Sequence, residues 1–291
     1  MRLRSLLLCL ASLLPLLPLA AALGADDIIF EDGVEYSNPD NQHLQLNIAR
    51  AAHAEGKLPA VLCIHGGGFR AGGRGDYNDL CKKLAGRGYV AASVAYRLAP
   101  KYQFPAAIYD VKAAVRWLRA NAEKYQIDSP RIASLGGSAG GHLATFLGVT
   151  GGVQQFEGDG GNAGQSSRVA CVIDYFGPMD FTKSYGKSVD AGQVLPLFLG
   201  GDLEHQRHRH ILASPFYWVT PEAAPTLLLH GTLDDYVAYD QSVAMLARLK
   251  AADVDAQLLT LEGAKHGFGG HDAERAEQAA FDFLDKHLKS K

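Results

Sequence analysis

A single serine stands among small residues in the segment Gly136-Gly137-Ser138-Ala139-Gly140-Gly141. The residues before it, Arg131 to Leu135, are typical of a short buried strand, and Gly141 to Thr150 has the pattern of a helix. A serine on so sharp a strand-to-helix turn adopts an unfavourable backbone conformation, and the neighbouring chain comes too close for bulky side chains. The segment therefore predicts a nucleophile elbow, with Ser138 as the nucleophile of a serine hydrolase.

A glycine run, His65-Gly66-Gly67-Gly68-Phe69, directly follows the apolar segment Ala60 to Ile64. Backbone N–H groups of Gly67 and Gly68 can point into a cavity because no Cβ blocks the approach. Together with the N–H of Ala139, they are predicted to form an oxyanion hole, in which each donor contributes ~3 kcal/mol. A phosphate-binding loop is the alternative, but the segment lacks the lysine and the spacing of a P-loop.

A general base and an acid are expected after the serine, in the order Ser, Asp, His. His266 follows the apolar run Gln257 to Leu261, and Asp234 and Asp235 follow the run that ends at His230. A histidine at such a strand end can take the serine proton, while an aspartate holds the imidazole in the correct tautomer. The spacing predicts His266 as the base and leaves Asp234 and Asp235 as competing candidates for the acid.

Apolar strand patterns alternate with helical patterns along the rest of the chain. Such alternation predicts an α/β fold, with a doubly wound, mostly parallel eight-stranded sheet that carries helices on both faces and has its functional loops at the carboxyl ends of the strands. Two candidate strands, Ile28–Tyr36 and His43–Arg50, are expected to form an antiparallel edge. The expected core strands are Ala60–Ile64, Val90–Tyr96, Arg131–Leu135, Val169–Asp174, Thr226–His230 and Gln257–Leu261, and the expected helices are Tyr77–Arg87, Phe104–Tyr125, Gly141–Thr150, Tyr239–Ala251 and Asp272–Lys289.

The amino-terminal residues 1–25 differ from the rest. Arg2 and Arg4 precede an apolar run from Leu6 to Leu19, and small residues follow. This order predicts a signal peptide that is cleaved near residues 22–25, so we expect a secreted or periplasmic protein. Residues 26–291 are expected to form one catalytic domain, and no stable membrane anchor is expected because the apolar run is short and contains two prolines.

Composition and charge bear on three questions: nucleic-acid binding, disulfide bonds and metal binding. The chain has 291 residues and a formal net charge of −3, with no basic stripe, so nucleic acid is not an expected partner. Beyond the leader, Cys63, Cys81 and Cys171 show no paired spacing, which leaves open whether any two form a disulfide. No metal site is expected: His205 and His208 could share a helical face, but Arg207 and Arg209 crowd them with positive charge.

The motifs resemble those of α/β-hydrolases of the esterase/lipase group, and within it bacterial secreted carbohydrate esterases of the bifunctional feruloyl and acetyl-xylan type. The resemblance spans nearly all of the chain after the leader. In similar sequences the catalytic aspartate stands four residues after the histidine of an HG pair and three before a valine, which implies Asp234 rather than Asp235. The residues that carry the resemblance are His65–Phe69, Tyr96–Pro100, Phe104–Ala107 with Asp110, Gly136–Gly141, Tyr175–Pro178 with Asp180, His230–Gly231 with Asp234 and Val237, and Gly263 with His266–Phe268.

The resemblance implies a serine carboxylic-ester hydrolase that forms an acyl-enzyme, needs no cofactor, and takes acetyl or feruloyl esters of polysaccharides or small esters as substrates. A serine peptidase or amidase and a lipase of the same fold remain alternatives, and the oligomeric state is left open. Two segments are expected to cap the site. One is the polar loop 151–167, and the other is an irregular, cap-like insertion at about 180–213.

Overall fold

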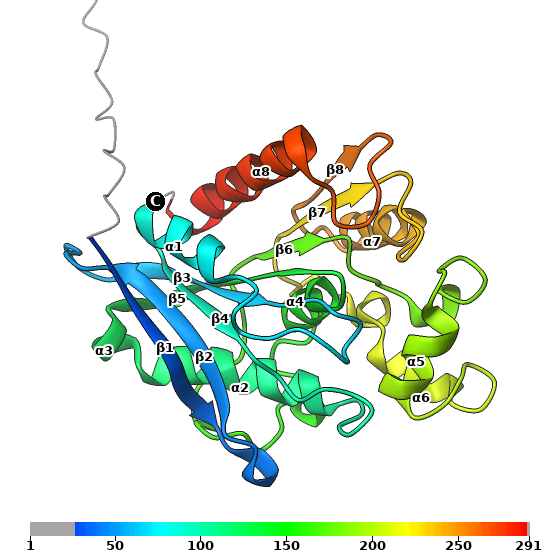
Figure 1. Ribbon diagram of the computed structural model, residues 1–291, viewed down its shortest axis with the longest axis horizontal. Coiled ribbons are helices and arrows are strands. Elements are labelled where there is room, and N and C mark those ends of the chain that lie inside the picture. Colours follow the sequence, from blue (N-terminus) through cyan, green and yellow to red (C-terminus); the bar gives the residue numbers. More distant parts are fainter. Residues whose placement is uncertain (1–26, 290–291) are drawn as a thin grey trace, which may run out of the picture.

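The computed structural model describes residues 27–289, and the expected leader lies outside them. They form one sheet of eight strands in the order β1-β2-β4-β3-β5-β6-β7-β8 (Figure 1). The first two strands pair antiparallel with each other, and β2 runs antiparallel to β4, while the others are parallel. The predicted α/β class, the mostly parallel sheet and its antiparallel edge are confirmed. The strands are β1 (Ile28–Ser37), β2 (Leu44–Ala51), β3 (Leu58–Ile64), β4 (Val90–Val94), β5 (Ile127–Gly137), β6 (Val172–Tyr175), β7 (Thr226–Gly231) and β8 (Ala256–Leu261).

Helices cover both faces of the sheet (Figure 1). Successive side chains of a strand point to opposite faces, so Leu62 and Ile64 of β3 pack with α2 and α4, whereas Val61 and Cys63 pack with α1 and α8. Helix α7 covers the far end of the first face, over β7 and β8. The helices are α1 (Asn78–Gly86), α2 (Ala106–Ala120), α3 (Ala122–Tyr125), α4 (Ala139–Val149), α5 (Ala191–Leu199), α6 (Arg207–Ala213), α7 (Asp240–Ala251) and α8 (Gly270–Leu288).

Two parts of the chain differ from expectation. The helix expected over Phe104–Tyr125 is divided at Asn121, which leaves the helical conformation with φ of −102° and ψ of 18° and whose side chain donates to the Trp117 carbonyl at 2.9 Å. The insertion 180–213 is not irregular, because it contains α5 and α6. Ser188 Oγ accepts a hydrogen bond from the first N–H of α5 at 3.1 Å, and Gly200, with φ of 79°, ends that helix.

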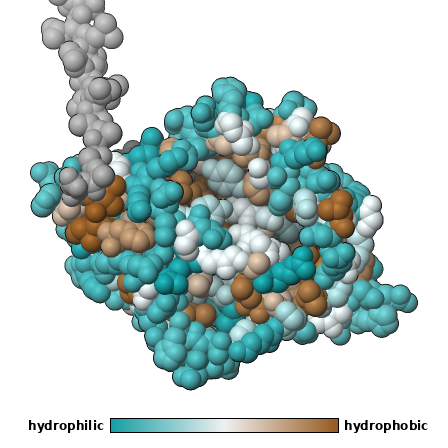
Figure 2. Space-filling view, in the orientation of Figure 1, coloured by the Kyte–Doolittle hydropathy of each residue, from teal (hydrophilic) through white to brown (hydrophobic). Residues whose placement is uncertain are grey.

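The three described cysteines, Cys63, Cys81 and Cys171, are buried free thiols. The surface in Figure 2 is largely hydrophilic, with hydrophobic residues in small separate groups and a hollow towards the middle. Among residues 27–289, no helix is long and apolar enough to cross a membrane.

Candidate active site

Ser138 occupies the turn between the central strand β5 and helix α4. The strand ends at Gly137 and the helix begins at Ala139, so Ser138 alone makes the turn, with φ of 55° and ψ of −121°. A positive φ is strained for a residue with a Cβ, and surrounding contacts hold it: the Ser138 N–H donates to the Tyr175 carbonyl at 2.8 Å. At Gly140 a Cβ would lie 1.9 Å from the Ile64 carbonyl oxygen, which explains why the elbow needs glycine there.

The glycine run after β3 faces Ser138 across a shared cavity. Gly67 has φ of 99°, and a Cβ there would lie 2.3 Å from the Ala71 carbonyl oxygen, so only glycine fits this turn. Within residues 27–289, the N–H groups of Gly67 and Gly68 donate no hydrogen bond. The N–H of Ala139 also lacks a partner inside the helix, because it belongs to the first helical residue. Three free donors therefore border the cavity that Ser138 enters.

The two candidate aspartates differ in their contacts and exposure. Asp234 Oδ2 lies 2.7 Å from His266 Nδ1, while Asp235 is exposed on the surface of the loop. The other carboxylate oxygen, Oδ1, accepts hydrogen bonds from the N–H groups of Tyr236 and Val237, each at 2.9 Å. Asp234 thus has one oxygen fixed by backbone and the other directed at the imidazole, the arrangement that orients a general base.

A second histidine shares the Asp234 carboxylate. His230 Nε2 lies 3.3 Å from Asp234 Oδ2 and 2.9 Å from the Val237 carbonyl oxygen, and its Nδ1 lies 2.7 Å from Ser242 Oγ. Burial alone would raise the pKa of Asp234, but hydrogen bonds with His230, His266 and the Val237 N–H hold it well below its ordinary range. The carboxylate therefore stays ionised at neutral pH. The contact of His230 with this carboxylate is visible only in the structure.

Ser138, His266, Gly67, Gly68 and Ala139 all line one cavity of about 430 Å³. This volume lies within the usual range for small-molecule sites. Part of the wall comes from the insertion: Ala191, Val194 and Leu195 of α5 contribute apolar surface, and the loop before α5 adds polar side chains. The other lining residues are Phe69, Arg70, Ala71, Pro178, Phe181, Ser184, Lys187, Ser188, Asp190, Tyr236, Val237, Ala238 and Gln241.

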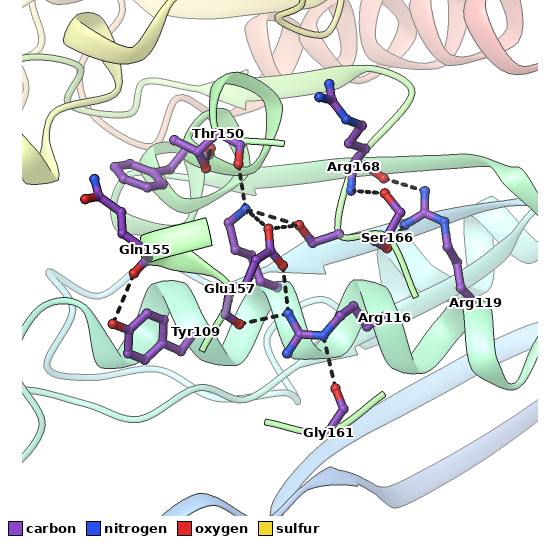
Figure 3. Close-up of polar contacts among 12 residues, drawn as sticks. Tyr109, Arg116, Arg119, Thr150, Gln155, Glu157, Gly161, Ser166 and Arg168 are labelled. Carbon is purple, nitrogen blue, oxygen red and sulfur yellow. Dashed lines mark hydrogen bonds and ion pairs between the residues drawn. The ribbon is translucent and has the colours of Figure 1, made fainter. Parts of the chain in front are cut away.

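The loop 151–167 lines no part of this cavity, contrary to the expectation that it would cap the site. It packs instead against α2, through charged groups that sequence patterns did not connect (Figure 3). Glu157 accepts hydrogen bonds from Lys112 Nζ at 3.0 Å and Arg116 Nη1 at 2.9 Å, and both cations are buried. Buried cations require a paired anion, so Glu157 holds the loop on the helix, away from the cavity that Ser138 and His266 line.

Asp174, on β6, is a buried carboxyl group close to the elbow. Its Oδ1 accepts a hydrogen bond from the Gly177 N–H at 3.0 Å, while Oδ2 has no partner among the described residues. A Cβ on Gly141 would lie 2.2 Å from the same Oδ1, so helix α4 packs directly on this carboxyl group. Burial raises the pKa of Asp174 well above its ordinary value, against the opposing effect of the Gly177 N–H.

We expect the replacement Asp174→Asn to stabilise the protein increasingly as pH rises. The folded state binds the Asp174 proton more tightly than the unfolded chain. In the unaltered protein, the stability that protonated Asp174 contributes is therefore complete below the unfolded pKa of about 4 and is lost as pH rises through the folded pKa. Asparagine cannot lose a proton there, and its carbonyl oxygen can still accept from Gly177. Urea unfolding at about pH 5 and about pH 8 measures the effect, with Glu204→Gln as an exposed control. A stability difference that does not grow with pH would contradict the assignment.

No group of three or more His, Cys, Asp or Glu side chains within residues 27–289 is arranged to hold a metal ion. His205 precedes α6, so it does not share a helical face with His208, and its Nδ1 lies 2.7 Å from Asp202 Oδ1. Arg97, in the segment after β4, and Asp110 of α2 are joined by an ion pair of 2.8 Å.

Comparisons with known proteins agree with this fold. Esterase LipC of Mycobacterium tuberculosis is 32% identical over 230 residues, which cover 76% of this chain and 56% of that protein. An ethyl acetate hydrolase of Pseudomonas putida is 33% identical, over 72% of this chain and 65% of that protein. The chain thus spans between about half and two thirds of the length of these curated relatives.

A solved structure described as a truncated form of a carbohydrate esterase from gut microbiota superposes with a TM-score of 0.81 at 27% identity, covering 92% of this chain and 99% of that one. The family model described as BD-FAE matches residues 46–249. The elbow, the glycine run and the Asp234 loop all lie within this match. With most of its described fold covered, the chain belongs to the BD-FAE family of α/β-hydrolase esterases.

Proposed function

We propose that this protein is a carboxylic-ester hydrolase in which Ser138, His266 and Asp234 act as nucleophile, general base and orienting acid. The observation that carries the proposal is the Asp234–His266 contact of 2.7 Å, because His266 lines the same cavity as Ser138, a serine held at positive φ. Because Asp234 accepts at Nδ1, that nitrogen carries the proton and Nε2 is left as the acceptor. An unprotonated Nε2 is what removal of the Ser138 proton requires.

The proposed reaction has two halves. Ser138 Oγ attacks the ester carbonyl while His266 Nε2 takes its proton, and the carbonyl oxygen becomes negative beside the N–H groups of Gly67, Gly68 and Ala139. The C–O bond to the alcohol then breaks, and the proton on His266 passes to the departing oxygen. Water, deprotonated by His266, attacks the acyl-enzyme and releases the carboxylic acid and free Ser138.

We further propose that its natural substrates are acetyl or feruloyl groups on polysaccharides. Support comes from the BD-FAE match and from the likeness to a gut carbohydrate esterase over nearly its whole length. The cavity also combines an apolar wall from α5 with polar side chains at Ser188 and Asp190, which suits a small acyl group attached to a hydroxyl-rich partner. An exported enzyme, as the leader predicts, would meet such polymers outside the cytoplasm.

A substrate panel tests the proposal. We expect the purified chain to hydrolyse p-nitrophenyl acetate and butyrate, and to release acid from acetylated xylan or methyl ferulate. Ser138→Ala, assayed beside it, controls for contaminating hydrolases. Activity on the synthetic esters alone would support the hydrolase and remove the polysaccharide assignment. Cleavage of amides or long-chain acyl esters with none of these substrates turned over would indicate a peptidase or a lipase.

A further inference from the structure

Tyr236 stands at the edge of the catalytic cavity and does not take part in the proposed bond-making steps. It lines the cavity with Ser138 and His266, and 47% of its surface is exposed. Its ring centroid lies 5.2 Å from that of His266, with an angle of 36° between the rings. Its N–H donates to Asp234 Oδ1 at 2.9 Å, so the backbone that carries the ring is fixed to the proposed catalytic acid.

The chemistry of ester cleavage decides which half of a substrate meets this ring. His266 must deliver its proton to the departing alcohol oxygen, which therefore lies within hydrogen-bond reach, about 3 Å, of Nε2. The carbonyl oxygen lies at the N–H groups of Gly67, Gly68 and Ala139 instead. The departing alcohol is therefore bound next to His266, whose ring centroid lies 5.2 Å from that of Tyr236.

Polar side chains border the same side of the cavity. The Val189 N–H donates to the Asp235 carbonyl at 2.9 Å, which ties the loop before α5 to the loop that carries Tyr236. On that loop Ser188 and Asp190 line the cavity, and Asp190 uses only one carboxylate oxygen with Ser188. An exposed aromatic face with hydroxyl and carboxylate groups beside it suits a ring that has one apolar face and a hydroxylated edge.

We propose that Tyr236 is a specificity-determining residue that binds the alcohol part of the ester by stacking on a sugar ring. The inference rests on the proposed esterase function and adds to it the placement of the sugar. A stacking contact of this kind contributes to binding and to the acylation transition state, and it leaves the later hydrolysis of the acyl-enzyme unchanged.

Three acetate esters with different alcohols separate this role from a structural one: an acetylated xylo-oligosaccharide, phenyl acetate and ethyl acetate. All three give the same acetyl-enzyme, so differences in kcat/KM report the alcohol part alone. For Tyr236→Ala we expect kcat/KM on the sugar acetate to fall about three- to tenfold, with less than a twofold change on ethyl acetate. Tyr236→Phe keeps the aromatic face and is expected to restore at least half of the loss.

Tyr217→Ala is the matched control, because Tyr217 is similarly exposed, at 42%, and does not line the cavity. Its replacement is expected to leave the ratio between the three substrates unchanged. An equal fall on all three acetates with Tyr236→Ala would overturn the inference, since it would mean that the ring only positions His266. A loss confined to phenyl acetate would overturn it in favour of an aryl alcohol. If the unaltered chain hydrolysed none of the three, the proposed function itself would fail, and the inference with it.

Discussion

Replacement of Ser138 by alanine is expected to lower kcat for ester hydrolysis by about five to six orders of magnitude, to near the background rate. The acyl-enzyme route requires a hydroxyl at this position, and among the described residues that line the cavity Ser138 alone stands on the turn between β5 and α4, next to the N–H of Ala139. Hydrolysis of p-nitrophenyl acetate, followed against a heat-inactivated sample, has the range to measure this loss.

Stability measurements distinguish lost chemistry from lost fold. Alanine shares the positive φ of Ser138 at the same cost, so the urea midpoint of Ser138→Ala is expected to match that of the unaltered chain. Ser138→Gly should be equally inactive but more stable, because glycine adopts φ of 55° without strain. Turnover within tenfold of the unaltered enzyme in either variant would show that another group attacks the ester.

Much of the geometry of the candidate site could be predicted because each part is a local strand-end signal. Continuous apolar runs mark buried parallel strands, and the carboxyl ends of such strands meet at one edge of the sheet. The sequence motifs at Ser138, Gly67 and His266 could therefore be expected to converge before their positions were known. The choice of Asp234 over Asp235 depended on resemblance. In the structure, Asp234 is held in place by the hydrogen bonds that its Oδ1 accepts from two backbone N–H groups.

Contacts between distant segments could not be predicted in the same way. The pairing of Glu157 with Lys112 and Arg116 joins residues about 40 positions apart, and no periodicity indicates which loop acid meets which helix cation. Helix α5 could not be predicted because it contains Pro196, a residue that usually interrupts a helix, although Ser188 and Gly200 mark its ends. Tyr236 looked like an ordinary loop residue, because its importance comes from the ring of His266, which is remote in sequence.

Replacement of Asp234 by asparagine is expected to lower kcat by about four orders of magnitude while the fold is retained. The N–H groups of Tyr236 and Val237 require an oxygen at the Oδ1 position, so the new carboxamide must place its NH₂ where Oδ2 now faces His266 Nδ1. An NH₂ group donates, so Nδ1 becomes the acceptor and the imidazole proton moves to Nε2. His266 then presents a proton to Ser138 and can no longer remove one.

Asp235→Asn is the matched control, since it makes the same chemical change one residue away on an exposed side chain. The contact that Asp235 makes with Val189 uses its backbone carbonyl and survives the substitution, so we expect less than a twofold change in kcat. His230 Nε2, which lies 3.3 Å from Asp234 Oδ2, would also face the new NH₂ group, so in the Asp234 variant both histidines lose this oxygen as an acceptor. A larger loss for Asp235→Asn than for Asp234→Asn would reverse the assignment of the acid, because only a group that accepts from the imidazole can hold Nε2 ready for the serine proton.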